Sequence, residues 1–160
     1  MTCPNCARAV NPESFFCSWC NVLLASPSRG TRAGLFARWM ALMIDPLIGI
    51  ILYVVIGGGA LAISETFGTI VAFGFPLAYL IWFLLLLREG LTPGKRILGL
   101  RVVRPDSGEI PGFGTMFVRE FVGRFVSGLF LGLGYLWAII DRNGQAWHDK
   151  IARTVVVRAA

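Results

Sequence analysis

Two long apolar runs constrain this chain more than any other feature of its sequence. From residue 39 to residue 64 there is a single charged side chain, Asp45, and from 66 to 87 there is none. A helix needs about 20 predominantly apolar residues to cross the hydrocarbon core of a bilayer. We therefore expect two transmembrane helices, one at about 35–57, ending at Gly57–Gly59, and one at about 66–87.

The composition agrees with a membrane protein. Hydrophobic residues make up 56% of the 160 residues and charged residues only 15%, whereas a soluble domain carries about 25% charged residues. The net charge of +6 would suggest nucleic acid as the partner of a soluble protein. No basic stripe with interleaved aromatic residues appears, however. We expect the lipid bilayer as the partner, and not nucleic acid.

Basic residues flank the two runs on their outer sides. They are Arg29, Arg32 and Arg38 before the first run, and Arg88, Lys95 and Arg96 after the second. The connection between the runs carries Glu65 and no Lys or Arg, so the positive-inside rule assigns both flanks to the cytoplasm. Residues 1–34 contain no apolar run typical of a signal peptide. We expect a multi-pass plasma-membrane protein with a cytoplasmic N-terminus.

All four cysteines lie within residues 1–24. They form two Cys-x-x-Cys pairs separated by ten residues, namely Cys3, Cys6, Cys17 and Cys20. Two such pairs supply the four thiolates of a closed tetrahedral zinc site, and a segment this small needs metal binding to fold. Two disulfides are disfavoured in a reducing cytoplasm, and a redox-active pair lacks a thioredoxin-like context. We predict a structural zinc ribbon.

The segment resembles short zinc ribbons that commonly carry Gly directly after each cysteine pair. Ala7 and Asn21 take those places here. Asn tolerates a left-handed backbone and Ala does so poorly, so the first turn is expected to be the less favourable. Residues 25–34 are polar and basic without apolar periodicity, and they are expected to form a linker.

Residues 88–114 are expected to leave the membrane. Leu100–Arg104 is strand-like, and the sequence from Pro105 to Gly108 is typical of a turn. We predict a cytoplasmic β-hairpin over about 96–112, with Glu109–Ile110 as the returning strand, to which residues 152–157 could add a further strand. Lys95 and Arg96 are expected at the lipid head groups.

Residues 115–141 allow two interpretations. The uncharged stretch from Val126 to Ile140 is about 22 Å long as a helix, short of a hydrocarbon core of about 30 Å. Extending it backwards includes Glu120 and Arg124, which can pair at a spacing of four residues. One interpretation is an interfacial helix followed by a crossing. The other, which we favour, is a re-entrant helical pair broken near Gly132 and Gly134.

Asp45 is the charged residue that most needs an explanation. Arg38 and Asp45 are seven residues apart and therefore lie on one face of a helix. An acid inside a span is costly unless it is paired, hydrated or protonated, which makes it a functional candidate. Pro46 frees a backbone carbonyl beside it. The alternative is structural, with Arg38 reaching the interface and Asp45 pairing with a base.

Three stretches together resemble the RDD family of membrane proteins. They are the run from Arg38 to Asp45, the run Gly90-Leu-Thr-Pro-Gly-Lys-Arg-Ile-Leu-Gly-Leu-Arg-Val-Val103, and the ending from His148 to Val157. The resemblance covers about residues 34–158. It implies that Arg38, Asp45 and Asp149 are the family's Arg and two Asp, with Asp141 as the alternative for the last. It also implies a transport role, which has been proposed for the family and includes cation/proton exchange for some of its members.

Two functions therefore follow as hypotheses. The first is transport of a small solute or a cation/proton, which would require a homo-oligomer because three short spans enclose little volume. The second is a membrane-anchored interaction or regulatory module whose zinc ribbon binds a cytoplasmic protein. We expect no enzyme, because no nucleophile–base set or open metal site can be identified in the sequence.

Overall fold

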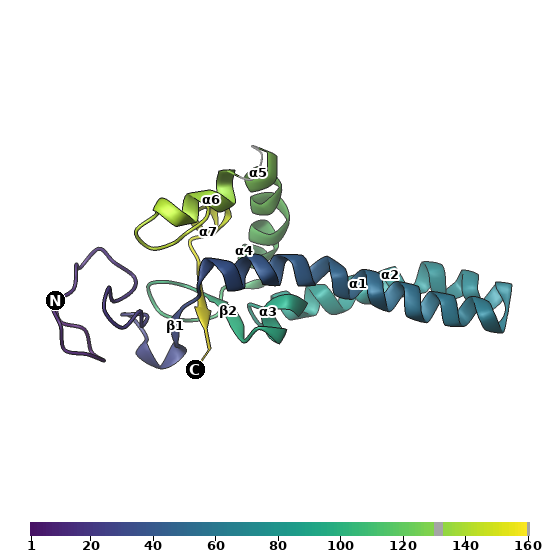
Figure 1. Ribbon diagram of the computed structural model, residues 1–160, viewed down its shortest axis with the longest axis horizontal. Helices are drawn as coiled ribbons and strands as arrows, with labels where there is room; N and C mark the ends of the chain where they lie inside the picture. The colour runs from purple at the N-terminus through teal and green to yellow at the C-terminus, as the bar shows by residue number, and fades with distance from the viewer. Residues whose placement is uncertain (130–132, 160) are drawn as a thin grey trace.

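The computed structural model describes residues 1–129 and 133–159. They form a long helical hairpin, a bent helical segment beside one end of that hairpin, and a small sheet with the N-terminal cysteines next to it (Figure 1). The expected fold class is confirmed: a helical membrane bundle with a small β element and an N-terminal cysteine cluster.

The hairpin consists of α1, Leu35–Ile63, and α2, Glu65–Leu87, which lie side by side (Figure 1). Both helices are long and apolar enough to cross a membrane. Most of their large apolar side chains are exposed. Such exposure is costly in water and favourable in lipid, so the two predicted spans are present as elements of the right length and surface.

α1 does not end at Gly57–Gly59 as expected, but continues to Ile63. In an apolar medium a backbone N–H or C=O group finds no partner outside the helix, so glycines do not readily end it. The turn is made by Ser64, whose hydroxyl accepts a hydrogen bond from the N–H of Phe67 at 3.1 Å. The connection between the helices is therefore a single residue.

The third segment is helical but sharply bent. Its first arm runs without a break through an α-helix, a π-helical turn and a second α-helix, and its second arm is bent from the first by 93°. The pieces are α4 Phe113–Phe117, the π turn Val118–Gly123, α5 Arg124–Leu129 and α6 Leu133–Ile140. This shape corresponds to a broken span or a re-entrant loop.

The two glycines at which we expected the break have different places. Gly132 lies outside the described residues. Gly134 lies inside α6, where a Cβ atom would stand 2.6 Å from the Cα of Ser127 in α5. Gly134 therefore allows the two arms of the bent segment to pack closely.

The sheet has three short antiparallel strands in the order β1–β3–β2. They are β1 Thr31–Arg32, β2 Leu100–Val103 and β3 Val155–Arg158. A short helix precedes each of the last two strands: α3, Pro93–Ile97, lies before β2, and α7, Trp147–Ile151, lies before β3. The central strand is thus the one nearest the C-terminus, and it holds the other two together.

The partner of β2 differs from the expected hairpin. Val102 and Val103 pair with Val156 and Val155 of β3, while residues 109–112 form no strand. The turn remains, because the N–H of Arg104 donates to the carbonyl of Glu109 at 2.8 Å. A returning strand would meet Pro111, which has no N–H to donate, whereas β3 buries three valines.

Residues 1–24, here called the cysteine segment, pack directly on the sheet. Phe16 and Leu23 form an apolar cluster with Val103, Val155 and Val157. Residues 25–34, expected to be a linker, contain a 3₁₀ turn at Pro27–Arg29 and strand β1. They continue the packed structure from the cysteine segment into the sheet.

Candidate functional site

A cluster of buried charged side chains lies where α1 meets the bent segment and the sheet. We call it the charge network. Its members come from five elements: Arg38 and Asp45 from α1, Lys95 from α3, Arg119 and Glu120 from the π turn, Arg124 from α5 and Asp149 from α7. The chain therefore concentrates most of its buried charge at one point.

Asp149, in the first turn of α7, joins two arginines. Arg38 forms an ion pair with its Oδ2 atom, and Nη2 of Arg119 lies 2.6 Å from its Oδ1 atom. The backbone N–H of Ala146 also donates to Oδ2, at 3.1 Å. Burial alone would raise the pKa of Asp149, but Arg119 and Arg38 hold that pKa well below its usual range. Asp149 is thus a buried carboxylate.

Asp45 is held by a different set of partners. The backbone N–H of Gly94 donates to its Oδ1 atom at 2.7 Å, and Nη2 of Arg124 lies 3.2 Å from its Oδ2 atom. α3 reaches Asp45 because Gly94 lies so close to the Ala41 carbonyl that a Cβ atom would overlap with it. The structure thus pairs Asp45 with Arg124 and Arg38 with Asp149.

Glu120 contacts three cations. Its Oε1 atom lies 2.6 Å from Nζ of Lys95 and 2.5 Å from Nη1 of Arg119, and its Oε2 atom lies 2.5 Å from Nη2 of Arg124. Lys95 is therefore not at the lipid head groups as expected, whereas Arg96 is exposed. Burial lowers the pKa of Lys95 to about 7, although Glu120 opposes that shift.

The π turn explains how adjacent residues reach different partners. In a regular α-helix, residues next to each other in sequence point in different directions. The wider turn at Val118–Gly123 presents both Arg119 and Glu120 to the network, where the two side chains also contact each other. Single π turns occur frequently at functional sites. The π turn therefore marks this part of the bent segment as a candidate functional region.

His148 and Asp141 lie at the edge of the network. Nδ1 of His148 is 3.2 Å from the hydroxyl of Ser127, and burial lowers the pKa of this histidine to about 3, so it is neutral at neutral pH. Asp141 pairs with Lys150 at 2.6 Å and accepts the N–H of Gln145 at 2.8 Å. Asp141 thus stabilises its own loop. Of the two aspartates, it is Asp149 that belongs to the charge network.

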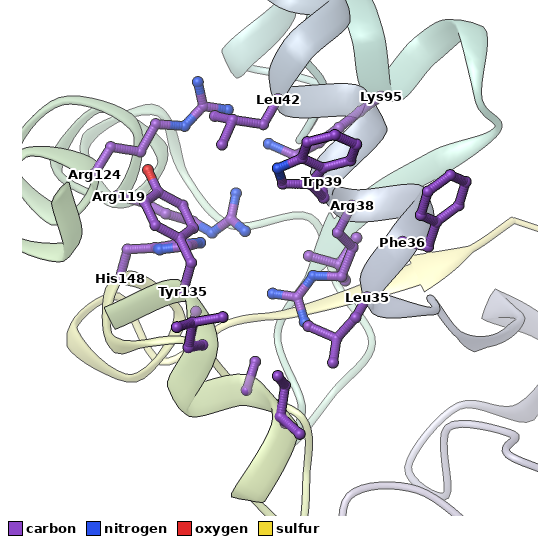
Figure 2. Close-up of a pocket in the computed structure, with 15 residues that line it drawn as sticks. Leu35, Phe36, Arg38, Trp39, Leu42, Lys95, Arg119, Arg124, Tyr135 and His148 are labelled. Carbon is purple, nitrogen blue, oxygen red and sulfur yellow. The ribbon is translucent and has the colours of Figure 1, made fainter. Parts of the chain in front are cut away.

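A pocket of about 340 Å³ opens beside the charge network (Figure 2). The side chains of Arg38, Lys95, Arg119 and Arg124 line it, together with His148. In Figure 2 Arg38 lies on the α1 side of the open space, and Arg119, Arg124 and Tyr135 lie across from it. Apolar side chains of α1 and α6 complete the lining on both sides. No carboxylate belongs to the described lining.

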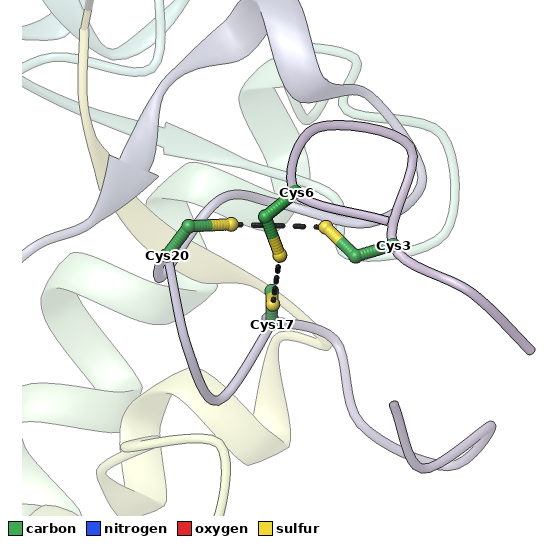
Figure 3. Close-up of side chains that lie close together, drawn as sticks. All are labelled: Cys3, Cys6, Cys17 and Cys20. Carbon is green, nitrogen blue, oxygen red and sulfur yellow. Dashed lines mark hydrogen bonds between the residues drawn. The ribbon is translucent and has the colours of Figure 1, made fainter. Parts of the chain in front are cut away.

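The four cysteines form a second candidate site. Their Sγ atoms all lie within 4.8 Å of one another, and those of Cys3 and Cys20, and of Cys6 and Cys17, are 3.7 Å apart (Figure 3). A tetrahedron with metal–sulfur bonds of about 2.3 Å has edges of about 3.8 Å. The donor set therefore fits a zinc ion, and these cysteines could hold a metal.

The backbone of the second cysteine pair favours thiolates, whereas at Cys6 the N–H of Arg8 lowers the pKa but burial and the neighbouring thiols raise it to about 11. The N–H of Cys20 contributes most to lowering the pKa of Cys17, which falls to about 6. Ala7 and Asn21 both have positive φ values, 56° and 55°. Each donates its N–H to the backbone carbonyl oxygen of the first cysteine of its own pair, at 2.9 Å. The two left-handed turns expected after the pairs are thus present.

Sequence reasoning did not name four members of the network as site candidates: Lys95, Arg119, Glu120 and Arg124. Lys95 was expected at the lipid head groups, and Glu120 was expected to pair with Arg124, as it does. The available signal was the presence of three charges, at 119, 120 and 124, inside a segment that is otherwise apolar enough for a membrane. Charged residues in such a segment face the protein interior and pair there.

The helical hairpin, the bent segment and the buried ion pairs define a multi-pass helical membrane protein. Intramembrane or interfacial charges are tolerated in such proteins when they are paired. The chain belongs to the RDD family, whose model matches residues 32–153. The cysteine segment lies outside that match.

Its relatives carry little functional description. The chain is 30% identical over 136 residues to an uncharacterized protein of Haemophilus influenzae, which covers 82% of this chain and 81% of that one. It is 34% identical over 83 residues to a proline-rich antigen homolog of Mycobacterium tuberculosis (51% and 34%). It is 35% identical over 75 residues to the uncharacterized protein YckC of Bacillus subtilis (44% and 49%). No solved structure matches the chain.

Proposed function

We propose that this protein is a membrane-anchored interaction module whose metal-loaded cysteine segment binds a cytoplasmic protein. The observation that carries the proposal is the packing of Phe16 and Leu23 on Val155 and Val157 of β3. A flexible tether would leave the cysteine segment free to turn. This packing gives the segment a fixed orientation relative to the bundle, as a presented docking surface requires.

The charge network supports the same proposal. β3 follows directly after α7, and Asp149 of α7 is tied to Arg38 of α1 and to Arg119 of the π turn. Removing one member of a buried ion pair costs about 3–5 kcal/mol, because a charge is then left buried without a partner. The network therefore holds the sheet, and with it the cysteine segment, at one end of the membrane helices.

The outer surface of the cysteine segment has the character of a contact site. Trp19 is 62% exposed, and the guanidinium carbon of Arg8 lies 4.6 Å from the centre of its ring. Tryptophan and arginine are the side chains most enriched at the energetic centres of protein interfaces. We infer that Trp19 and Arg8 face the partner and that the N-terminus is cytoplasmic, in keeping with its reduced thiols and the basic flanks.

A photo-crosslinking residue in place of Trp19 tests the proposal in living cells. We expect a discrete adduct with a cytoplasmic protein, and we expect Cys17→Ser to abolish the adduct while membrane insertion is unchanged. The same crosslinker in place of Phe73, an exposed residue of α2, is the matched control and should give lipid adducts. If Cys17→Ser leaves the Trp19 adduct unchanged, the metal-loaded segment does not present the docking surface.

Transport remains the second candidate, because Asp45 is a buried carboxylate inside a membrane-length helix. Against cation transport stand the pairing of each network carboxylate with a cation and the fact that Asp45 is not part of the described lining of the pocket. If transport is the function, Asp45→Asn should abolish ion flux in proteoliposomes, whereas Glu65→Gln at the far end of α2 should not. Equal flux of Asp45→Asn and the unsubstituted protein would remove this candidate.

A further inference from the structure

The pocket beside the charge network is lined by both charged and apolar side chains. Arg38, Lys95, Arg119 and Arg124 form its charged lining, and apolar side chains of α1 and α6 form most of its apolar lining. We propose that this pocket binds the phosphodiester headgroup of an anionic phospholipid from the surrounding bilayer. This site is separate from the cysteine segment and does not depend on the partner proposed for it.

The charge balance of the network calls for an anion. Four cationic side chains contact three carboxylates, those of Asp45, Glu120 and Asp149. When Lys95 is protonated, one positive charge is therefore in excess, because His148 beside them is neutral. An uncompensated charge in a buried site is costly. Because the cations line the pocket and the carboxylates lie behind them, the compensating charge would enter from the pocket.

The exposed parts of the charged lining suit a phosphate. The side chains of Arg124 and Arg38 keep 22% and 13% of their surface exposed, while those of Lys95 and Arg119 are almost completely buried. A guanidinium has five N–H groups in a planar fork that matches phosphate oxygens. The pocket thus borders the partly exposed side chains of two arginines, with two further cations behind them. A phosphodiester carries the single negative charge that would balance the network with Lys95 protonated.

The apolar lining indicates that a lipid is the source of that phosphate. Phe36 and Trp39 of α1, and Leu136 and Ile139 of α6, line the pocket and are each more than half exposed. They belong to helices that are expected to contact the membrane. A pocket of about 340 Å³ is larger than a phosphate ion needs. Basic pockets among membrane helices are known to take lipid head groups.

Native mass spectrometry of the zinc-loaded chain of 160 residues tests the proposal. The protein would be released from detergent micelles that contain equal amounts of phosphatidylglycerol and phosphatidylcholine, lipids that share a phosphodiester but differ in net charge. We expect one phosphatidylglycerol retained per chain, with a preference of about tenfold or more over phosphatidylcholine. That ratio corresponds to one charge-assisted hydrogen bond.

Two arginine-to-glutamine substitutions, one at Arg124 and one at Arg96, locate the site, and Arg124→Lys tests the role of the charge. Arg124→Gln should remove the preference for phosphatidylglycerol, and Arg124→Lys, which keeps the charge, should retain most of it. Arg96→Gln removes one charge from an exposed arginine outside the pocket and should leave the preference unchanged. If Arg124→Gln fails to fold, the competition measured on the unsubstituted protein still tests the proposal.

Three results would overturn the lipid assignment. Equal retention of the two lipids would show that charge does not select the occupant. Displacement of phosphatidylglycerol by millimolar inorganic phosphate would show that the site takes the free anion. A preference that Arg96→Gln lowers as much as Arg124→Gln would place lipid binding on the general basic surface and not in the pocket.

Discussion

Asp149 holds two arginines from different elements while it is itself fully buried. We predict that Asp149→Asn destabilises the protein by about 3–5 kcal/mol, because Arg38 and Arg119 would keep their charges without a counter-ion. Thermal unfolding in detergent would measure the change. The control is Asp141→Asn, since Asp141 pairs with a largely exposed Lys150 and should cost about 1 kcal/mol or less. Equal costs would contradict the central place given to Asp149.

Ala7 offers a stabilising substitution at the metal site. It has a φ of 56°, a conformation that costs an L-residue about 1–2 kcal/mol and that glycine adopts freely. We predict that Ala7→Gly raises the zinc affinity of the protein about fivefold or more, measured by competition with a chromophoric chelator. Ala9→Gly, at a neighbouring position without positive φ, should give no gain. A lower affinity for Ala7→Gly than for Ala9→Gly would contradict this account of the first turn.

At the scale of elements, the approach of α3 to α1 sets the position of Asp45. A Cβ atom at Gly94 would overlap with the carbonyl of Ala41, while one at Gly112 would meet nothing within 4 Å. We predict that Gly94→Ala costs about 2 kcal/mol or more, since the backbone must move and the hydrogen bond to Asp45 is lost. Gly112→Ala should be nearly neutral in the same unfolding assay. Similar stabilities of the two variants would show that α3 is not held where the structure has it.

The elements and the site were predictable to different degrees. The spans, the cysteine pairs and the left-handed turns after them follow from local patterns, because hydropathy and ligand spacing act over a few residues. The pairing of Asp45 with Arg124 crosses 79 positions, and that of Arg38 with Asp149 crosses 111. No local pattern encodes such pairs. The family resemblance singled out Arg38, Asp45 and Asp149, but it did not give their partners.

Two errors in the elements have different physical causes. Local signals predicted an end of α1 at Gly57–Gly59 and a returning strand at Glu109–Ile110. Backbone hydrogen bonding in an apolar medium continued α1 past its glycines. Burial of the valines of β3, which are distant in sequence, gave β2 a different partner. Turn and breaker residues therefore predicted where the chain could turn but not which partner it would meet.

At the scale of the whole molecule, three parts are joined in series. The cysteine segment packs on β3, β3 follows α7, and α7 is tied through Asp149 to the membrane hairpin and the bent segment. A second apolar cluster beneath the sheet adds to this connection, with contributions from α1, α2, α4 and two strands: Ala41, Leu87, Met116, Val102 and Val156. The cysteine segment is thus a structural part of the sheet end of the RDD domain.

Hydrogen–deuterium exchange of the protein in nanodiscs, with and without zinc chelation, tests this continuity most directly. We predict that chelation increases amide exchange in residues 1–24 and also in β1 and β3, because Phe16 and Leu23 would no longer cover Val155 and Val157. Exchange in the far half of the α1–α2 hairpin should not change. An increase confined to residues 1–24, with β3 as protected as before, would show that the cysteine segment is an independent tethered domain and would contradict the account.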